Sequence, residues 1–241
     1  MTIRYGIIGT GMMGCEHIRN LAAMEGVDIT AIADPNEKPR DWGRNACGDR
    51  FAPEVYEDYR DLLARDDVDA VVVASPNYSH IDVMRDIFQT DKHVMLEKPM
   101  CTTITDSKEL VKSADQHPGI VWIGLEYRYM SPITATLQHL DAIGDIRMCA
   151  IREHRFPFLK KVGNWNRFNR NTGGTLVEKC CHFFDLMTQV IPSEPIRVIA
   201  SGGQDVNHLD EFYNGETPDI MDNAYVIVEF ANGARALLDL C

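Results

Sequence analysis

Positive charge is scarce in this sequence. Its 241 residues include 24 Lys and Arg but 36 Asp and Glu, which gives a formal net charge of −12 at pH 7. A chain with this balance repels phosphate backbones and anionic lipid surfaces. We therefore expect neither nucleic acid nor a membrane among its partners.

Long apolar runs and paired cysteines are also missing. No stretch approaches the roughly 18 apolar residues that a membrane span needs. The first residues, MTIRYGIIG, lack the basic head and long apolar segment of a signal peptide. The seven cysteines are odd in number and show no C-x-x-C spacing, which is typical of reduced thiols in an intracellular protein. These absences predict a soluble, cytoplasmic protein without a disulfide framework.

The N-terminal half alternates short apolar runs with helical patterns. Runs rich in Val and Ile, bounded by Gly, Pro, Asp or Ser, predict buried strands at 5–9, 28–34, 69–75, 93–97 and 120–126. The segments between them predict helices at 12–25, 57–65, 78–90 and 103–116, the last capped by Thr103 or Thr105. This alternation predicts an α/β fold with a doubly wound parallel sheet, a dinucleotide-binding domain over residues 1–126.

The pattern changes after residue 126. A helix is predicted at 132–142, a half-buried strand at 145–156, a polar and aromatic loop at 157–172 and a helix from about 174 to 190. Residues 223–230 and 234–240 predict a hairpin joined by Ala231, Asn232 and Gly233. We expect an α+β substrate and oligomerisation domain over 127–241 with a mixed, mostly antiparallel open sheet. Because the chain stops at Cys241 on the second hairpin strand, an unpaired edge is expected there, as in a truncated form of a longer protein.

A glycine-rich loop directly follows the first predicted strand. Gly9, Gly11 and Gly14 have the G-x-G-x-x-G spacing, and the helix that begins at Met12 and Met13 offers free N–H groups to a pyrophosphate. Asp34 ends the second strand, where a carboxylate accepts hydrogen bonds from a ribose 2′-hydroxyl. A surface turn with a capping Asp does not explain this spacing. The carboxylate favours NAD over NADP, although the nearby Lys38 and Arg40 leave NADP open.

Polar residues follow two further strands of the predicted sheet. Ser75, Asn77 and His80 follow one strand, and Glu97 and Lys98 follow the next. Ligands of doubly wound sheets bind beyond the carboxyl ends of the strands. We therefore expect these residues to contact the cofactor, although helix capping is the alternative for Asn77 and His80.

Three motifs, read in chain order, resemble the Gfo/Idh/MocA oxidoreductase family, which includes inositol and sugar dehydrogenases. They are the glycine loop at 9–14, S-P-N-x-x-H at 75–80 and E-K-P at 97–99. The resemblance covers essentially the whole chain and implies a Rossmann domain followed by an α/β domain with a large open sheet. It also implies association through the open sheet face, so a homo-oligomer is expected of the full-length protein.

The segment GGTLVEKCCHFFD, residues 173–185, resembles the family's later motif, in which an acid precedes a histidine by four residues. The family usually has Asp as the acid and Gly two residues before the histidine, whereas this chain has Glu178 and Cys180. Glu178 and His182 are expected to share one helix face. The adjacent Cys180 and Cys181 do not predict a metal site, because no second ligand cluster lies at a useful spacing.

These residues suit an alcohol oxidation with a nicotinamide. Lys98 is expected to polarise the substrate oxygen or relay its proton, and His182 to accept that proton, because imidazole titrates near neutrality. Glu178 is expected to orient the substrate or hold His182, and Glu97 to position the cofactor. Further substrate contacts are predicted at Tyr127, Arg128, Trp165 and Arg170.

The sequence leaves three function classes open. The first is an NAD(P)-dependent dehydrogenase that acts on a secondary alcohol of a sugar, cyclitol or related polyol. The second is an enzyme that uses NAD for a transient oxidation during glycoside cleavage. The third is a non-catalytic NAD(P)-binding regulator, which the presence of Lys98 and His182 disfavours.

Overall fold

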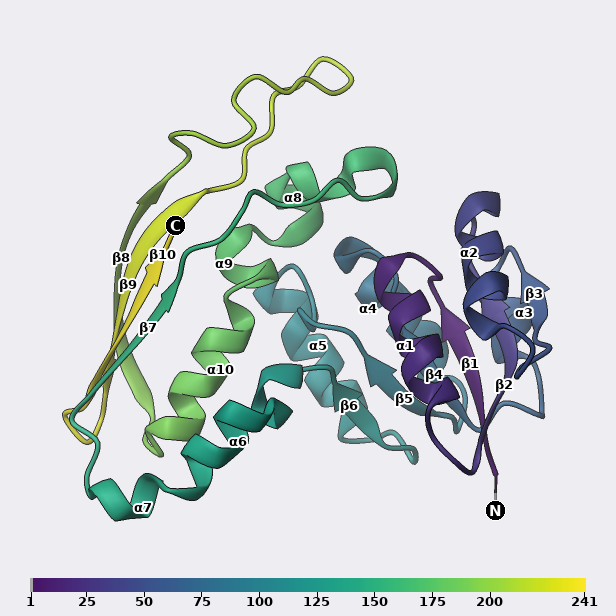
Figure 1. Ribbon diagram of the computed structural model, residues 1–241, viewed down its shortest axis with the longest axis horizontal. Helices are drawn as coiled ribbons and strands as arrows, with labels where there is room; N and C mark the ends of the chain where they lie inside the picture. The colour runs from purple at the N-terminus through teal and green to yellow at the C-terminus, as the bar shows by residue number, and fades with distance from the viewer. Residues whose placement is uncertain (1) are drawn as a thin grey trace. The chain divides into compact units, whose positions relative to one another are not determined.

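The computed structural model describes residues 2–241, which form two compact units (Figure 1). The first unit ends at Gly124 and the second runs from Leu125 to Cys241. Each unit has a β-sheet and a hydrophobic core of its own.

The first unit is built on six parallel strands in the order β3-β2-β1-β4-β5-β6. The strands are β1 (Ile3–Ile8), β2 (Val27–Ala33), β3 (Glu54–Tyr56), β4 (Ala70–Val73), β5 (His93–Leu96) and β6 (Val121–Ile123). The strand order reverses between β1 and β4, as in dinucleotide-binding folds. The predicted doubly wound parallel sheet is therefore confirmed.

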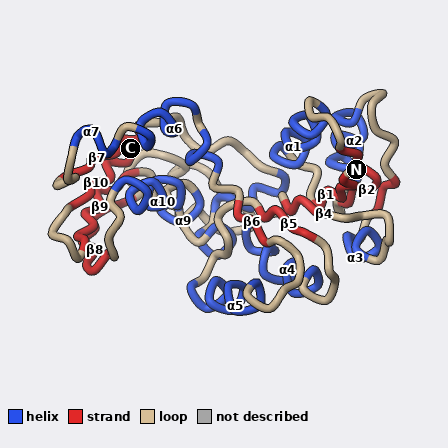
Figure 2. The backbone as a smooth tube through the Cα atoms, turned by 90° about the horizontal axis from the view of Figure 1, so that it is seen from below, coloured by secondary structure: helices blue, strands red, loops and turns tan. Residues whose placement is uncertain are grey.

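Helices cover both faces of this sheet, with α1 and α2 on one face and α3, α4 and α5 on the other (Figure 2). They are α1 (Met12–Ala22), α2 (Glu37–Cys47), α3 (Tyr59–Leu63), α4 (His80–Ile87) and α5 (Ile104–Ala114), with the short 3-10 helix η1 (Asn77–Ser79) before α4. Because both faces are covered, the central strands have no solvent side: all four residues of β4 are buried. This explains why these strands read as continuous apolar runs.

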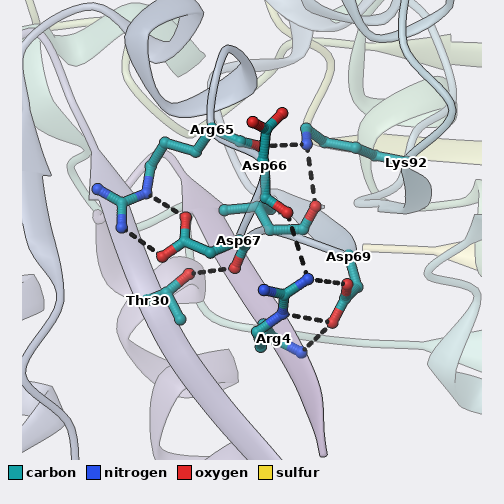
Figure 3. A network of polar contacts seen from close by, with 8 residues as sticks. Arg4, Thr30, Arg65, Asp66, Asp67, Asp69 and Lys92 are labelled. Carbon is teal, nitrogen blue, oxygen red and sulfur yellow. Dashed lines mark hydrogen bonds and ion pairs between the residues drawn. The ribbon is translucent and has the colours of Figure 1, made fainter.

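A charged network closes the amino ends of β1, β4 and β5 (Figure 3). Arg4 Nη2 donates to Asp69 Oδ1 at 2.6 Å, and Lys92 Nζ donates to the carbonyl oxygens of Arg65 and Val68 at 2.7 and 2.9 Å. The hydrogen bonds from Arg4 lower the pKa of Asp69 to about 2. This network lies at the edge of the sheet opposite to the carboxyl ends, where ligands of such folds bind, so we assign it to stability.

Two elements of the first unit, α2 and β3, are not predicted from the sequence. The α2 segment contains Pro39 and Gly43, which usually weaken a helix. A Cβ atom on Gly43 would lie 2.8 Å from Thr10 Cγ2 and 2.9 Å from Ile32 Cδ1. Close packing of α2 on the sheet therefore requires glycine there. By contrast, the predicted cap of α5 is confirmed, because Thr103 Oγ1 accepts a hydrogen bond from Asp106 N at 3.1 Å.

The second unit has a four-stranded mixed sheet in the order β7-β10-β9-β8. The strands are β7 (Met148–Glu153), β8 (Pro195–Gly203), β9 (Asn223–Phe230) and β10 (Arg235–Leu240). Strands β9 and β10 form the predicted hairpin, and the β7–β10 pair is parallel. The predicted mixed, mostly antiparallel sheet is confirmed. The expected edge at the chain end is wrong, because β10 is paired on both sides and the edges are β7 and β8.

Helices pack against one face of this sheet (Figure 1). The helices of this unit are η2 (Glu126–Tyr129), α6 (Ser131–Gln138), α7 (Leu140–Ile143), η3 (Val162–Arg167), α8 (Asn169–Thr172), α9 (Thr175–Glu178) and α10 (Cys181–Val190). Residues of η2, α9 and α10 join the hydrophobic core on this face. The segment 157–172 thus contains two short helices rather than only the predicted loop. The opposite sheet face stays open and carries exposed apolar side chains, among them Ile199, Tyr225 and Ile227.

The single helix predicted from about 174 to 190 is wrong. It is divided into α9 and α10 at Lys179 and Cys180, where Cys180 N bonds to Thr175 O, five residues back, at 3.4 Å. Glu178 ends α9 and His182 lies in the first turn of α10. The two residues therefore lie in two successive helices and not in the one continuous helix that was predicted.

Candidate active site

The glycine loop has the geometry that its spacing predicts. Gly9 has a φ of +87°, which favours glycine, and a Cβ atom on Gly14 would lie 1.9 Å from Gly9 O. A Cβ on Gly11 would have no heavy atom within 4 Å, so this side of the loop is open. Helix α1 begins next, at Met12 and Met13, and the first N–H groups of a helix have no partner within it. The loop therefore offers an anion an open approach to a helix N-terminus.

Asp34 lies directly after β2 and is mostly buried. Its Oδ2 accepts a hydrogen bond from Thr10 N at 3.0 Å, and its Oδ1 accepts one from Asn36 N at 2.9 Å. These bonds fix the carboxylate beside the glycine loop, and a carboxylate has further lone pairs for ligand hydroxyls. Of the two nearby cations, Arg40 donates to Asp34 O at 2.8 Å, whereas Lys38 Nζ lies 5.4 Å from the centre of the Trp42 ring.

The segment after β4 is joined to the segment after β5 by a buried histidine. His80 is 0% exposed; its Nδ1 lies 2.9 Å from Pro99 O and its Nε2 lies 3.0 Å from Ser75 O. Burial lowers the pKa of His80, against the effect of the two carbonyl oxygens, which favour the charged ring. This position suits a residue that fixes both segments better than the predicted cofactor contact. Ser75 and Asn77 lie on the same segment, and Ser79 Oγ donates to Ser75 Oγ at 2.8 Å.

Glu97 and Lys98 lie at the carboxyl end of β5. Glu97 is 5% exposed; its Oε1 lies 2.7 Å from His17 Nε2 on α1, and its Oε2 accepts a hydrogen bond from Lys98 N at 3.1 Å. Burial works against the charged carboxylate, but the His17 hydrogen bond and the charges of His17 and Lys98 hold the pKa of Glu97 below its ordinary value. The Lys98 side chain is half-buried, and its bond to Pro99 is a cis peptide. Sequence reasoning missed His17, which lies 80 residues from Glu97.

His182 lies in a polar cluster of the second unit. It is 2% exposed, and its ring stacks on Tyr127 with centroids 4.1 Å apart and an angle of 7° between the planes. Lys179 Nζ donates to the Tyr127 hydroxyl at 2.6 Å and lies 3.3 Å from Glu153 Oε1. Glu126 Oε1 lies 4.0 Å from His182 Nε2. Lys179 and Glu153 were not predicted; the departure from the family motif at 178–180 is the only sequence signal near them.

The remaining predicted residues of the second unit have partners of their own. Glu178 is buried and accepts a hydrogen bond from Lys161 Nζ at 3.3 Å. Arg128 Nε donates to Asp185 Oδ2 at 2.6 Å, which joins η2 to α10. Arg170 forms an exposed ion pair with Glu216 at 2.6 Å.

Trp165 is half-buried, and Lys161 Nζ lies 4.6 Å from the centre of its ring. Trp165 and Glu178 thus share Lys161 as a neighbour. The structure brings Glu97 and Lys98 together in the first unit, and Tyr127 and His182 in the second. The meeting of Lys98 with His182 stays a prediction.

The described residues, 2–241, contain no group of three or more His, Cys, Asp and Glu side chains that could hold a metal ion. Cys180 is fully buried, and burial raises the pKa of its thiol to about 12. Over the same residues, no helix is long and apolar enough to cross a membrane.

Two family models match the chain. Residues 3–125 match the NAD-binding Rossmann fold of the Gfo/Idh/MocA oxidoreductase family, and residues 139–241 match that family's C-terminal alpha/beta domain. Together the matches extend over both units of the structure. The NAD-binding character predicted for the first unit is thereby confirmed.

Individual relatives agree with this match. Inositol 2-dehydrogenase of Salmonella typhimurium is 36% identical over 135 residues, which are 54% of this chain and 38% of that relative. The 2,7-anhydro-N-acetylneuraminate hydratase of Mediterraneibacter gnavus is 25% identical over 240 residues, 99% of this chain and 61% of the relative. A solved structure of Lactobacillus casei myo-inositol dehydrogenase in complex with NAD(H) and myo-inositol has a TM-score of 0.76 at 22% identity and covers 100% of this chain and 68% of its own.

The chain is shorter than its relatives. It spans 62%, 65% and 61% of the length of three curated relatives that match almost all of it.

Proposed function

The chain belongs to the Gfo/Idh/MocA oxidoreductase family, and from this membership we propose that the whole protein transfers a hydride between NAD and a secondary alcohol of a sugar, cyclitol or related polyol. The observation that carries the proposal is the match of both family domains. The relatives named inositol 2-dehydrogenase and myo-inositol dehydrogenase support a polyol as the substrate class.

The residues of the first unit fit NAD. Gly11 leaves open space where a pyrophosphate would approach, and the N–H groups at Met12 and Met13 would hold it. Asp34 would accept a hydrogen bond from the ribose and would repel a 2′-phosphate, which favours NAD over NADP. Ser75 and Asn77 would contact the cofactor further along the sheet edge. When bound, NAD supplies the ring carbon that exchanges hydride with the substrate.

The chain's own side chains handle the proton. Oxidation of an alcohol requires a base within hydrogen-bond reach of the hydroxyl. Lys98, whose backbone is fixed through Glu97, would polarise that oxygen, and His182 would accept the proton. The Tyr127 ring lies flat against the His182 ring and limits its rotation. Glu178 is buried beside Lys161 and would orient the substrate.

The four predicted substrate contacts differ in how far the geometry supports them. Tyr127 is best supported, because it packs directly on His182. Arg128 and Arg170 have carboxylate partners, so we propose that Arg128 acts by holding α10 through Asp185. Trp165 would offer an apolar ring face to a sugar.

The proposal is tested by a screen of polyols and sugars with NAD and NADP, with the absorbance of reduced nicotinamide as the readout. Lys98→Ala and His182→Ala are each expected to lower turnover by about 10²–10⁴-fold, because each removes a proton-handling group, while NAD still binds. Lys112→Ala, on the exposed face of α5, is the matched control and should keep full activity. Near-normal turnover by both site variants would refute the catalytic assignment.

A second candidate is an NAD-dependent reaction without net redox change, such as a glycoside cleavage through transient oxidation. It is favoured by the similarity to a relative named as a hydratase. Net formation of reduced nicotinamide separates the two, because a redox-neutral reaction consumes substrate without it. NAD binding without consumption of any substrate would instead indicate a regulator.

We also propose that the full-length protein is a homo-oligomer. The supporting observation is the open face of the second sheet, where Ile199, Tyr225 and Ile227 are 44%, 61% and 37% exposed. Exposed apolar patches of this kind often form protein interfaces. Light scattering coupled to size-exclusion chromatography of the full-length protein tests the proposal, and a monomeric mass would refute it.

A further inference from the structure

We propose that His17 is a positioning residue that places Lys98 through the Glu97 carboxylate and couples that placement to the cofactor loop. The inference rests on the proposed function for its catalytic consequence. His17 Nε2 lies 2.7 Å from Glu97 Oε1, and the two side chains are only 15% and 6% exposed. This is a short, largely desolvated contact between groups on different elements, α1 and the end of β5.

Each oxygen of the Glu97 carboxylate has a different hydrogen-bond partner. Oε1 meets His17, and Oε2 accepts the hydrogen bond from Lys98 N at 3.1 Å. A change at Oε1 therefore acts on the backbone of the next residue. If His17 no longer bonds, a buried carboxylate keeps its charge with fewer partners and rotates toward other donors. Lys98 N then loses the acceptor that fixes its peptide.

The segment that carries Lys98 is held from a second side as well. Glu97 N donates to Val73 O at 2.9 Å, and His80 Nδ1 lies 2.9 Å from Pro99 O. The main chain on both sides of Lys98 is therefore fixed to neighbouring elements. His17 is the member of this set that comes from α1, the helix that starts at the cofactor loop.

Because His17 lies on α1, it can link the cofactor loop to Lys98. It lies in the second turn of α1, and the N-terminus of that helix attracts the anionic part of a dinucleotide. A cofactor that fixes the start of α1 also fixes His17, and through Glu97 it fixes Lys98. Bound cofactor should therefore restrict the Lys98 segment even when no substrate is present.

The competing explanation is that the pair only stabilises the fold, as many buried ion pairs and hydrogen bonds do. The chain offers a matched histidine for this comparison. His117 is also half-buried in the first unit, and its Nε2 lies 2.8 Å from the carbonyl oxygen of Lys92, before β5. Its bond lies at the opposite end of β5 from Glu97, so substitution there should cost stability alone.

The experiment compares His17→Leu, His17→Gln and His117→Leu in the full-length protein. The first readout needs no substrate. It is the rate at which an amine-reactive reagent modifies the Lys98 side chain, measured by peptide mass spectrometry with and without NADH. The second is the NADH dissociation constant by fluorescence. The third is kcat and KM with a polyol found by the screen. Urea unfolding of each variant measures the stability change.

For His17→Leu we expect the modification rate of Lys98 to change about threefold or more and its response to NADH to disappear, because the acceptor of its peptide N–H is no longer fixed. We expect kcat to fall about tenfold or more while KM and the NADH dissociation constant change little, because misplacement of a catalytic group costs rate rather than binding. His17→Gln retains a hydrogen-bond donor, so it should recover most of the parent's Lys98 modification behaviour and most of its kcat. In a Glu97→Gln background, His17→Leu should add little further loss.

His17→Leu would overturn the inference if Lys98 modification and its response to NADH stayed as in the parent protein and only stability fell, as for His117→Leu. The failure of the proposed function gives a different result. If no polyol were oxidised even by the parent protein, the modification arm would still decide whether His17 places Lys98.

Discussion

Replacing Gly14 by alanine tests whether the glycine loop owes its packing to a missing side chain. The Cβ atom of alanine would lie 1.9 Å from Gly9 O and 3.0 Å from Gly9 C. Both are backbone atoms, so no flexible side chain can move aside. Either α1 must shift away from β1 or the tight turn at Gly9 must open.

The expected loss follows from two opposing effects. Alanine in a helix is favoured over glycine by about 1 kcal/mol. Forcing extra atoms into a packed site costs typically about 1–3 kcal/mol and occasionally more, and a contact with backbone at this distance belongs at the upper end. We therefore expect a net destabilisation of about 2 kcal/mol, the difference of these terms. With a urea slope of about 1–3 kcal/mol per molar, the unfolding midpoint should fall by roughly 1 M.

Gly11→Ala is the matched variant, because its Cβ atom would meet nothing within 4 Å. As a change from Gly to Ala at the N-cap of α1, it should cost no more than about 1 kcal/mol. Its methyl group would instead occupy the open side of the loop, so NAD affinity should fall about tenfold or more, equivalent to about 1.4 kcal/mol.

The assay is urea unfolding of the three proteins, followed by fluorescence titration with NADH. If Gly14→Ala unfolded at the same urea concentration as the parent, the packing argument for the third glycine would be refuted. If Gly11→Ala bound NADH as tightly as the parent, the dinucleotide would not approach the loop from that side.

Two further predictions concern carboxylates. Asp34→Ser removes the charge that repels a 2′-phosphate, so the preference for NADH over NADPH should fall about tenfold or more, and an unchanged ratio of dissociation constants would contradict that role. Burial works against the charged form of Glu211, but hydrogen bonds from Arg167, His208 and Tyr213 lower its pKa to about 2. Because the folded pKa lies below the value of about 4.3 expected in the unfolded chain, this contribution to stability is complete above about pH 4.3 and is lost as the pH falls toward 2. Glu211→Gln should therefore be less stable than the parent at pH 7 in urea unfolding, and a stability difference that did not shrink between about pH 4.3 and 2 would contradict the assignment.

Several features of the first unit follow from local sequence alone. Buried parallel strands are apolar on both faces, so β4 stands out as a continuous apolar run. The glycine spacing could be interpreted because each glycine answers a local steric demand, at Gly9 a positive φ and at Gly14 the approach of backbone to backbone. Thr103 caps α5 through an atom three residues away.

Other features depend on tertiary packing. Helix α2 contains Pro39 and Gly43, and its glycine makes sense only beside Thr10 and Ile32. No Gly or Pro lies at the break between α9 and α10. Glu178, Lys179 and Cys180, which lie there, are all tolerated in a helix. Helical spacing therefore predicted one helix through Glu178 and His182, whereas the structure has two.

By itself the sequence determined the doubly wound parallel sheet, the mixed second sheet and the residue types at the strand ends, because periodicity and glycine sterics act over a few residues. The tertiary structure decided which of those residues hold one another. His17 meets Glu97 across 80 residues, and Tyr127 meets both Lys179 and His182 across more than 50. Such partners are set by how elements pack, and nothing in the local pattern of either partner encodes them.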